Sequence, residues 1–277
     1  MKKIYFLVIV LPVYLSANFI GMNNGARSLA MGNAFVALSD EPTAIFSNPA
    51  GLARINQNYV IGSHQNLYGL SDLHNDMVAI SIYNSFIHIG IAFQQINLIN
   101  TYSEKIYYFS IAKSLKLNNI PFRVGSSLKY ESAKVYNYQD AKKPSNFDID
   151  LGVLVDLTDN IFLGYSIQYL LEPKFLFISN SEKLNRKSSL GICYNWQNFV
   201  NFLVDYVWSE NNSQWNLGSE MWFYNIFAAR LGIYNENLTG GFGLKTKKWS
   251  IDGGVIAHKQ LGSTYRISIG LKFGIIQ

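Results

Sequence analysis

From residue 58 to residue 273 the sequence divides into about fourteen successive segments of roughly ten residues, in which apolar residues alternate with small or polar ones. A β-strand points successive side chains to opposite faces, so each segment has one apolar face and one small or polar face. The alternation is clearest in residues 86–94, 147–157 and 265–273. A strand with this pattern separates two unlike surroundings.

The polar face of these segments distinguishes two kinds of β-protein. It carries Gly, Ser, Asn and scattered charges, whereas a soluble β-sandwich presents a solvated surface rich in Lys and Glu. Aromatic residues make up 15% of the chain and charged residues 15%, which suits a barrel with aromatic girdles. The sequence predicts an all-β fold, a transmembrane antiparallel β-barrel of about 14 strands. A soluble sandwich is the alternative.

Residues 1–17 have the parts of a secretory signal peptide: Lys2 and Lys3, an apolar core, and the cleavage sequence Leu15-Ser16-Ala17. A membrane-anchor helix is the alternative, but the apolar run is short for a bilayer span. An exported chain of amphipathic strands is expected in the cell outer membrane of a diderm bacterium. Its partners there are outer-membrane lipid and, during insertion, the barrel-assembly machinery.

The connections between the predicted strands are alternately short and longer. Short turns are predicted near residues 84–85, 118–121, 158–160, 196–198, 224–226 and 246–248. Between them lie the loops 66–75, 96–103, 136–146, 172–184, 209–213, 235–238 and 259–264. Because outer-membrane barrels have short periplasmic turns and longer extracellular loops, both chain ends are expected on the periplasmic side. The predicted barrel domain covers residues 56–277.

Residues 18–55 lack sustained two-residue alternation and are predicted as a separate N-terminal domain. Residues 26–38 are small and apolar, and Asp40 is expected to cap the helical turn that follows it. A segment this apolar is accommodated more easily inside the barrel than in periplasmic water. We therefore predict a plug or hatch, and a loosely ordered periplasmic tail is the alternative. The plug motif consists of Asn48, Pro49, Ala50 and Gly51.

Strand parity predicts which charged residues face the lumen. The inward set contains both signs and includes Arg123, Asp148, Asp150, Asp252 and Arg266. A turn at residues 224–226 would place Glu220 directly opposite Arg230, with both side chains inward, so we predict a lumenal ion pair between them. The pair either forms a polar constriction or a clamp on the plug, or it only matches charge across the lumen.

The most apolar predicted loop, residues 172–184, suggests a binding surface, because exposed apolar patches usually mark one. It is a candidate site for a hydrophobic ligand or a partner protein. The alternative is that the flanking strands extend beyond the membrane and pair these side chains with each other. The candidate residues are Phe175, Leu176, Phe177 and Ile178.

The sequence contains no pattern typical of a nucleic-acid-binding protein, a metalloprotein or a nucleotide-binding enzyme. The formal charge of +5 includes Lys2 and Lys3 of the signal peptide, and no cluster of Lys and Arg forms a nucleic-acid footprint. The four histidines lack metal-ligand spacing, and residues 240–243 (GGFG) lie in a predicted strand instead of before a helix. We therefore predict no enzyme activity, cofactor, metal or nucleic-acid partner.

Two stretches of the N-terminal domain carry a resemblance to a known family. Residues 25–37 (GARSLAMGNAFVA), with Asp40 and residues 48–52 (NPAGL), resemble the N-terminal signature of FadL-like outer-membrane proteins. Within that group the sequence looks closest to the PorV/PorQ branch. Weaker matches lie at residues 220–222, 230–234, 240–244 and 265–273. The resemblance runs from about residue 18 to residue 273.

The resemblance implies a fourteen-stranded barrel whose N-terminal segment folds into the lumen. In FadL proper, hydrophobic molecules such as long-chain fatty acids are captured at extracellular loops, enter the lumen and leave through a lateral opening. Barrels of the PorV/PorQ branch serve type IX secretion. This sequence departs from FadL proper in its short extracellular loops. It also lacks the terminal aromatic residue that the barrel-assembly machinery usually recognises, and Phe273 is expected to take that role.

Two functions are consistent with a plugged barrel of this family. The first is passive transport of hydrophobic, fatty-acid-like small molecules through a plugged channel, supported by the plug and the apolar loop. The second is a non-transporting component of type IX protein secretion at the cell surface, with a secreted protein as partner. The motif resemblance and the short loops support the second. A porin for hydrophilic solutes is disfavoured because a plug would block it.

Overall fold

The computed structural model describes residues 25–117, 120–136, 143–176, 181–258 and 261–274. The predicted signal peptide and the first residues of the predicted N-terminal domain lie outside these ranges. Within the described part of the chain, no helix is both long and apolar enough to cross a membrane.

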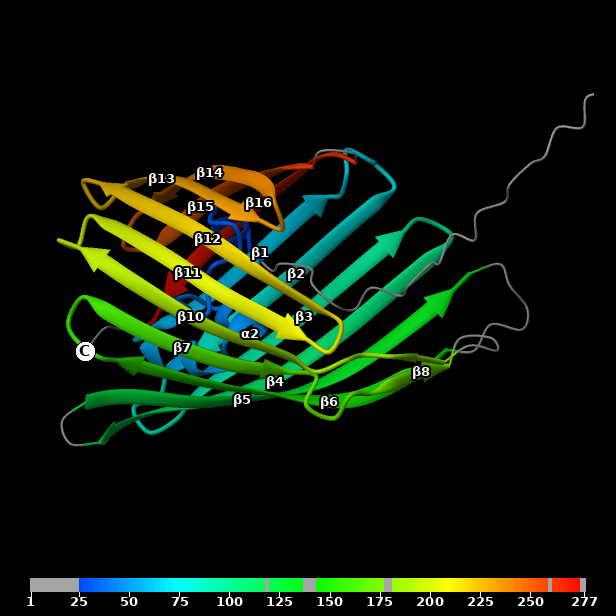
Figure 1. Cartoon of the computed structure of the whole chain (residues 1–277), viewed down its shortest axis with the longest axis horizontal. Coiled ribbons are helices and arrows are strands. Elements are labelled where there is room, and N and C mark those ends of the chain that lie inside the picture. Colours follow the sequence, from blue (N-terminus) through cyan, green and yellow to red (C-terminus); the bar gives the residue numbers. More distant parts are fainter. Residues whose placement is uncertain (1–24, 118–119, 137–142, 177–180, 259–260, 275–277) are drawn as a thin grey trace, which may run out of the picture.

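Fourteen antiparallel strands of the described chain close into one barrel (Figure 1). They follow one another around the barrel in chain order, and β1 completes it by pairing with β16. Closure leaves no free strand edge with unpaired backbone groups. The predicted fold class is confirmed. The barrel strands are β1 (Asn58–Asn66), β2 (Leu73–Ile82), β3 (His88–Leu98), β4 (Tyr102–Leu117), β5 (Ile120–Val135), β6 (Ser145–Asp156), β7 (Ile161–Gln168), β10 (Lys187–Trp196), β11 (Val200–Ser209), β12 (Asn212–Phe223), β13 (Phe227–Tyr234), β14 (Asn237–Lys245), β15 (Trp249–His258) and β16 (Gly262–Phe273).

Residues that alternate in the sequence face opposite sides of the barrel wall. In β3, Ile91 points outward and is 48% exposed, whereas the next residue, Ala92, points inward and is 4% exposed. Large apolar side chains are exposed in the same way on the other strands. Because a soluble protein does not leave so continuous an apolar surface in water, this is the lipid-facing wall of an outer-membrane barrel.

The two ends of the barrel differ in their connections. At one end, residues 224–226 join β12 to β13, and at the other end residues 169–186 join β7 to β10. Outer-membrane barrels have their longer connections outside the cell, so we assign the second end to the exterior. Some exterior connections are shorter than predicted, since residues 210–211 alone join β11 to β12 and residues 235–236 join β13 to β14.

The apolar loop predicted at residues 172–184 contains regular structure. β8 (Lys174–Leu176) and β9 (Ser181–Lys183) pair as a two-stranded antiparallel sheet that is separate from the barrel. β7 itself does not extend further, because it ends at Gln168 and the next residue, Tyr169, has a left-handed backbone with φ 56°. Beyond Tyr169 the chain stays beside β6, since the Leu170 N–H donates to Ile149 O at 3.1 Å and Asn146 Nδ2 donates to Lys174 O at 2.6 Å.

Residues 25–57, which we call the lumenal segment, lie inside the barrel, where Figure 1 shows them in blue. They form the short helices α1 (Ala26–Ala30), α2 (Ala44–Ser47) and η1 (Pro49–Arg54). α1 packs against β13–β16, and η1 packs against β3–β6, so the segment crosses the lumen from one wall to the opposite one. Of the apolar stretch 26–38, only α1 is helical, and turns make up much of the rest.

Glycines in the wall allow η1 to approach the strands closely. A Cβ atom on Gly152 would overlap the side-chain oxygen of Asn48, and one on Gly125 would overlap the backbone of Pro49 and Ala50. Any larger residue at these positions would push the lumenal segment away from the wall.

Candidate functional site

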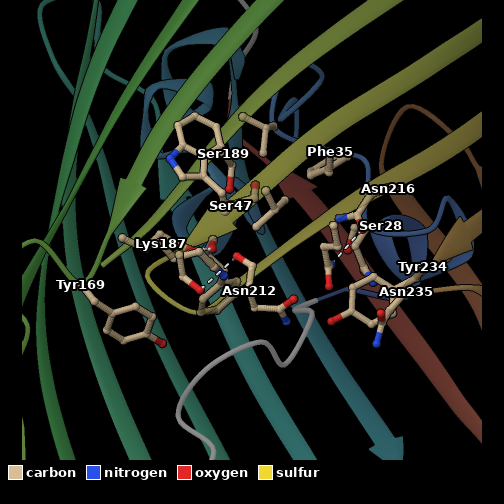
Figure 2. A pocket seen from close by; sticks show the side chains of 18 of the residues that line it. Ser28, Phe35, Ser47, Tyr169, Lys187, Ser189, Asn212, Asn216, Tyr234 and Asn235 are labelled. Atoms are coloured by element: carbon tan, nitrogen blue, oxygen red, sulfur yellow. Dashed lines mark hydrogen bonds between the residues drawn. The ribbon is translucent and has the colours of Figure 1, made fainter. Parts of the chain in front are cut away.

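A cavity of about 320 Å³, the upper cavity, lies between the lumenal segment and the exterior end of the barrel (Figure 2). Its floor includes Ser28, Phe35 and Ser47 of the lumenal segment. Its sides are formed by inward residues near the exterior ends of the strands, such as Lys187 of β10 and Asn212 of β12. The cavity is large enough for a small organic molecule.

The upper cavity has one aromatic side and one polar side. The aromatic side contains Phe46, Tyr108 and Tyr169, and the rings of Phe46 and Tyr108 meet edge to face with centroids 5.0 Å apart. The polar side is lined by Asn33, Asn212, Gln214, Asn216 and Asn235, and we call its three β12 residues, Asn212, Gln214 and Asn216, the amide wall. The cavity therefore suits a molecule with an apolar part and a polar part.

Lys129 closes the aromatic side with a buried ionic cluster. Its Nζ lies 2.9 Å from Asp150 Oδ1, 3.2 Å from Asp148 Oδ2 and 3.4 Å from Glu131 Oε1. The same ammonium lies 3.6 Å from the centroid of the Tyr169 ring, a cation–π contact. Three carboxylates thus surround the charge of Lys129, which leaves it little to offer a ligand.

The predicted lumenal residues Asp148 and Asp150 also hold the chain where it leaves the barrel. Asp150 Oδ1 accepts the backbone N–H of Tyr169 at 3.0 Å, and Asp148 Oδ1 accepts that of Leu171 at 3.0 Å. In a continuous sheet these N–H groups would donate to backbone carbonyls of β6. The two carboxylates replace some of these bonds, and so they position Tyr169 at the cavity.

Lys187 is the second cation of the upper cavity and differs from Lys129 in its surroundings. It points inward from the start of β10 and lines the cavity beside Tyr169 and Ser189, as Figure 2 shows. Within the described part of the chain it forms no ion pair, and no described lining residue of the cavity is acidic. Its charge is therefore available to a negatively charged or hydroxylated ligand.

The residues of the predicted apolar loop do not form one exposed patch. Phe175 is fully buried in the same apolar cluster as Phe46 and Tyr169, while Leu176 is 39% exposed. Alternation along β8 explains this, since neighbouring residues of a strand face opposite sides. Phe175 therefore belongs to the interior. Phe177 and Ile178 lie outside the described residues.

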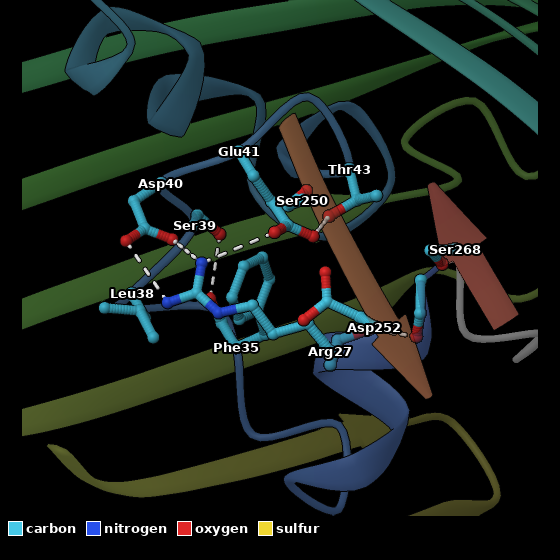
Figure 3. Close-up of polar contacts among 12 residues, drawn as sticks. Arg27, Phe35, Leu38, Ser39, Asp40, Glu41, Thr43, Ser250, Asp252 and Ser268 are labelled. Atoms are coloured by element: carbon cyan, nitrogen blue, oxygen red, sulfur yellow. Dashed lines mark hydrogen bonds and ion pairs between the residues drawn. The ribbon is translucent and has the colours of Figure 1, made fainter. Parts of the chain in front are cut away.

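On the periplasmic side, Arg27 of α1 links the lumenal segment to the barrel through Glu220, and Figure 3 shows its contact with Asp40 within the segment. Its Nε and Nη2 donate to the Glu220 carboxylate at 3.0 and 2.8 Å, and its Nη1 donates to Asp40 Oδ1 at 2.5 Å. Asp40 is therefore not the cap of α2, whose first position follows Thr43. Asp40 pairs instead with the charged Arg27 guanidinium, an interaction stronger than a hydrogen bond from a neutral backbone N–H.

The predicted partners Glu220 and Arg230 lie directly opposite each other in the β12–β13 ladder. Arg230 Nε is 3.6 Å from Glu220 Oε1, and Arg230 Nη1 is 2.8 Å from Asp252 Oδ1. Glu220 is thus held between Arg27 of the lumenal segment and Arg230 of the wall. The geometry is that of a clamp on the lumenal segment.

A lower cavity of about 100 Å³ lies on the periplasmic side of this cluster. Arg27, Asp40, Lys245 and Lys272 are among its lining residues. The Arg27 guanidinium carbon lies 5.6 Å from the centroid of the Phe35 ring, and Phe35 lines the upper cavity. The contact between Arg27 and Phe35 therefore lies between the two cavities.

Glu41 also borders the lower cavity and is almost completely buried. Thr43 donates a hydrogen bond to its Oε1 at 2.7 Å, and Arg27 Nη1 lies 3.4 Å from its Oε2. Burial raises the pKa of the Glu41 carboxyl to about 6, although the charge of Arg27 acts in the opposite direction.

The predicted plug motif joins three parts of the molecule. Asn48 Nδ2 donates to the carbonyls of Val36 and Val153, each at 3.0 Å, and its Oδ1 accepts the N–H of Ala50 at 3.2 Å. Pro49 occupies the first turn of η1, where its missing N–H costs no hydrogen bond. Gly51 lies against the backbone of Ser39, where a Cβ would overlap. The motif thus ties η1 to the wall.

The remaining predicted lumenal residues are separate from both cavities. Arg123 Nη1 donates to Asp156 Oδ2 at 2.7 Å, and Arg54 Nη2 donates to the other oxygen of Asp156 at 2.6 Å. Arg266 is buried and donates to Gln65 Oε1. No group of three or more His, Cys, Asp or Glu side chains among the described residues could hold a metal ion.

Sequence reasoning missed two residues that anchor the lumenal segment. Arg27 is one, and Asp205 is the other, because its Oδ2 accepts the N–H groups of Phe35 and Val36 at 2.7 and 2.9 Å. The parity of β11 places Asp205 inward, but nothing in the sequence says what it meets there. The sequence signal that could have identified Asp205 as an anchor is its place as an inward carboxylate on a strand that surrounds a predicted plug.

The fold and the site together define a fourteen-stranded outer-membrane barrel whose lumen is divided by its own N-terminal segment. Comparison with protein-family models finds no match, and comparison with curated protein sequences finds none. Solved structures with a similar fold include a TodX ΔS2S3 mutant monoaromatic hydrocarbon channel, with a TM-score of 0.66, 12% identity, and coverage of 91% of this chain and 99% of that chain.

Two further solved structures have the same fold. The CymD monoaromatic hydrocarbon channel matches with a TM-score of 0.66 and 11% identity, over 91% of this chain and 98% of that chain. A Pseudomonas aeruginosa FadL homologue matches with a TM-score of 0.63 and 11% identity, over 92% of this chain and 100% of that chain. At these identities the similarity concerns the fold.

Proposed function

We propose that this protein is a FadL-like outer-membrane channel for passive transport of hydrophobic, fatty-acid-like small molecules. The main supporting observation is the pair of cavities, about 320 and 100 Å³, that lie on opposite sides of the lumenal segment. The similarity in fold to hydrocarbon channels supports the same class of ligand. In this proposal residues 1–17 direct export, residues 18–55 act as the plug, and residues 56–277 form the barrel.

The aromatic side of the upper cavity provides the apolar contact for such a ligand. Phe46, Tyr108 and Tyr169 come from the plug, β4 and the exterior end of β7, so the site needs all three parts of the chain. Lys187 stands at the edge of this side and is suited to bind a carboxylate. A fatty acid placed here has its charge paired and its hydrocarbon chain among the rings.

Passage to the periplasm requires the plug to move, because the Arg27–Phe35 contact lies between the cavities. The Arg27–Glu220 clamp opposes that movement with two hydrogen bonds to a buried carboxylate. The channel is thus closed at rest. A ligand in the upper cavity contacts Phe35, and a movement of Phe35 displaces Arg27, which packs against its ring.

Uptake of a fluorescent long-chain fatty acid into liposomes that contain the full-length protein tests this proposal. Lys187→Met should weaken fatty-acid binding about tenfold, as expected for the loss of a charged hydrogen bond, and should leave binding of the matching alcohol unchanged. Lys105→Met, on the outer face of β4, is the matched control. Equal binding of the fatty acid to all three proteins would contradict a ligand site at Lys187.

A second candidate is a non-transporting PorV/PorQ-like component of type IX secretion, which would bind a secreted protein at the cell surface. It is favoured by the short connections 210–211 and 235–236, which leave the exterior rim low and accessible. Co-purification of secreted proteins with the barrel, combined with no fatty-acid uptake in liposomes, would favour this candidate over the channel.

A further inference from the structure

The amide wall of the upper cavity is built from regularly spaced side chains. Asn212, Gln214 and Asn216 occupy alternate positions of β12, so their amides follow one another on the inner face at about 7 Å intervals. Gln214 Nε2 donates to Asn216 Oδ1 at 2.9 Å, which fixes the two amides relative to each other. The ladder faces the cavity as a series of both donors and acceptors.

The plug contributes part of the floor of this polar half, next to the wall, since a Cβ on Gly218 of β12 would overlap the backbone of Met31. Asn33 has a left-handed backbone, φ 59°, and its buried side-chain oxygen and nitrogen have no hydrogen-bond partner among the described residues. Ser28 of the plug lines the same cavity as Asn216, Tyr234 and Asn235, all of which Figure 2 labels. A buried amide without partners costs free energy, so this position favours a molecule that supplies both a donor and an acceptor.

The charges of the cavity limit the kind of molecule that fits. No described lining residue is acidic, which disfavours a cationic ligand, and the amide wall itself is neutral. Neutral amides bind hydroxyl groups well, because each amide offers a donor and an acceptor to groups that can do both. A plain hydrocarbon would desolvate the amides of β12 and leave the Asn33 amide unpaired, at a cost for each group.

We infer that the amide wall binds an uncharged, hydroxyl-rich head group, and that the ligand of the upper cavity is an amphiphile of the alkyl-glycoside or glycolipid type. This inference rests on the proposed function and specifies its substrate class. The hydrocarbon chain lies on the aromatic side with Tyr108 and Tyr169, and the head group lies against Asn33 and the β12 ladder. Lys187, at the boundary, donates to a hydroxyl or glycosidic oxygen.

Calorimetric titration of the full-length protein in phosphatidylcholine nanodiscs tests the inference with three probes of equal chain length. The probes are decyl glucoside, decanol and decanoate, each below the concentration at which it aggregates, with empty nanodiscs to subtract partitioning. Decyl glucoside should bind at least about tenfold more tightly than decanol, because several additional hydrogen bonds form in the cavity.

The variant Asn212→Leu/Gln214→Met removes two amides of the ladder while keeping side-chain size. It should lose about tenfold in affinity for decyl glucoside and retain its affinity for decanol. Gln95→Met, on the outer face of β3, is the control for a Gln-to-Met change and should bind all probes like the unaltered protein.

The outcomes separate the inference from the proposed function. If decanol and decanoate bind but decyl glucoside binds no more tightly than decanol, the head-group inference is wrong and the channel proposal stands. If the ladder variant binds decyl glucoside as well as Gln95→Met does, the inference is also wrong. If none of the three probes binds, the proposed function fails, and the inference fails with it.

Discussion

The two halves of the lumenal segment are both held by an ion pair and by glycines of the wall, but their ion pairs differ in burial. In the first half, residues 25–41, Arg27 pairs with Glu220 of β12, whose side chain is completely buried. In the second half, residues 42–57, Arg54 pairs with Asp156 of β6, whose side chain is 19% exposed. Close packing is common to both, since a Cβ on Gly218 would overlap the backbone of Met31 and one on Gly125 would overlap that of Pro49. Because an unpaired charge costs more when it is fully buried, we expect loss of the ion pair to cost more in the first half.

Loss of the Arg27 charge tests the first half most severely. Arg27→Met should destabilise the folded barrel by about 3 kcal/mol, because Glu220 stays buried and loses its hydrogen bonds from Arg27. Urea unfolding followed by tryptophan fluorescence measures this. The double change Arg27→Met/Glu220→Gln should recover much of the loss, and an equal loss in both variants would show that the ion pair is not the anchor.

Crowding of the second half should have the next largest effect. Gly152→Ala places a methyl group against the side chain of Asn48 and should cost about 2–3 kcal/mol of overpacking. It should also make the lumenal segment accessible to limited proteolysis. Gly62→Ala, whose added Cβ would meet nothing within 4 Å, is the matched control. Equal protease resistance of the two variants would contradict the close docking of η1.

Removal of the Asn48 amide is a smaller change to the same half. Asn48→Ala leaves the carbonyls of Val36 and Val153 without this donor and should cost about 2 kcal/mol. Asn48→Asp keeps the cap of η1 but loses the two donated bonds, so it should be no more stable than Asn48→Ala. If Asn48→Asp matched the unaltered protein, the two carbonyl bonds would contribute nothing.

The pH dependence of stability is the test with the smallest expected effect, and it concerns Glu41 of the first half. Because the Glu41 carboxyl has a pKa of about 6 in the folded chain and 4.5 ordinarily, the folded form holds its proton more strongly. The contribution of Glu41 to stability is therefore most favourable below pH 4.5 and falls by up to about 2 kcal/mol as pH rises through 6. Glu41→Gln should remove this part of the pH dependence, and an unchanged profile would contradict a buried Glu41.

Much of the barrel follows from the sequence because strand alternation is a local property. The first and last strands begin and end where the pattern predicts, and the turn at residues 224–226 places Glu220 opposite Arg230 as expected. Both predictions need only the two-residue period and the length of one turn.

The site depends on contacts that local patterns do not contain. Arg27 and Glu220 are 193 positions apart, and the sequence offers no reason to pair Arg27 with Glu220 instead of another inward carboxylate. Phe175 was expected outside because its neighbours suggest a loop, yet a two-stranded sheet turns it into the apolar cluster. Strand parity alone predicts that the amides of β12 face inward, but their role in binding depends on the cavity that they line.

The division of the lumen into two cavities has a consequence for the cell. An open fourteen-stranded pore would admit detergents, antibiotics and other toxic solutes, and each added copy would weaken the permeability barrier. The Arg27–Phe35 contact lies between the two cavities, so the lumenal segment obstructs the lumen where these residues meet. In the proposed channel, closure at rest would let the cell carry many copies of this barrel at little cost to its envelope.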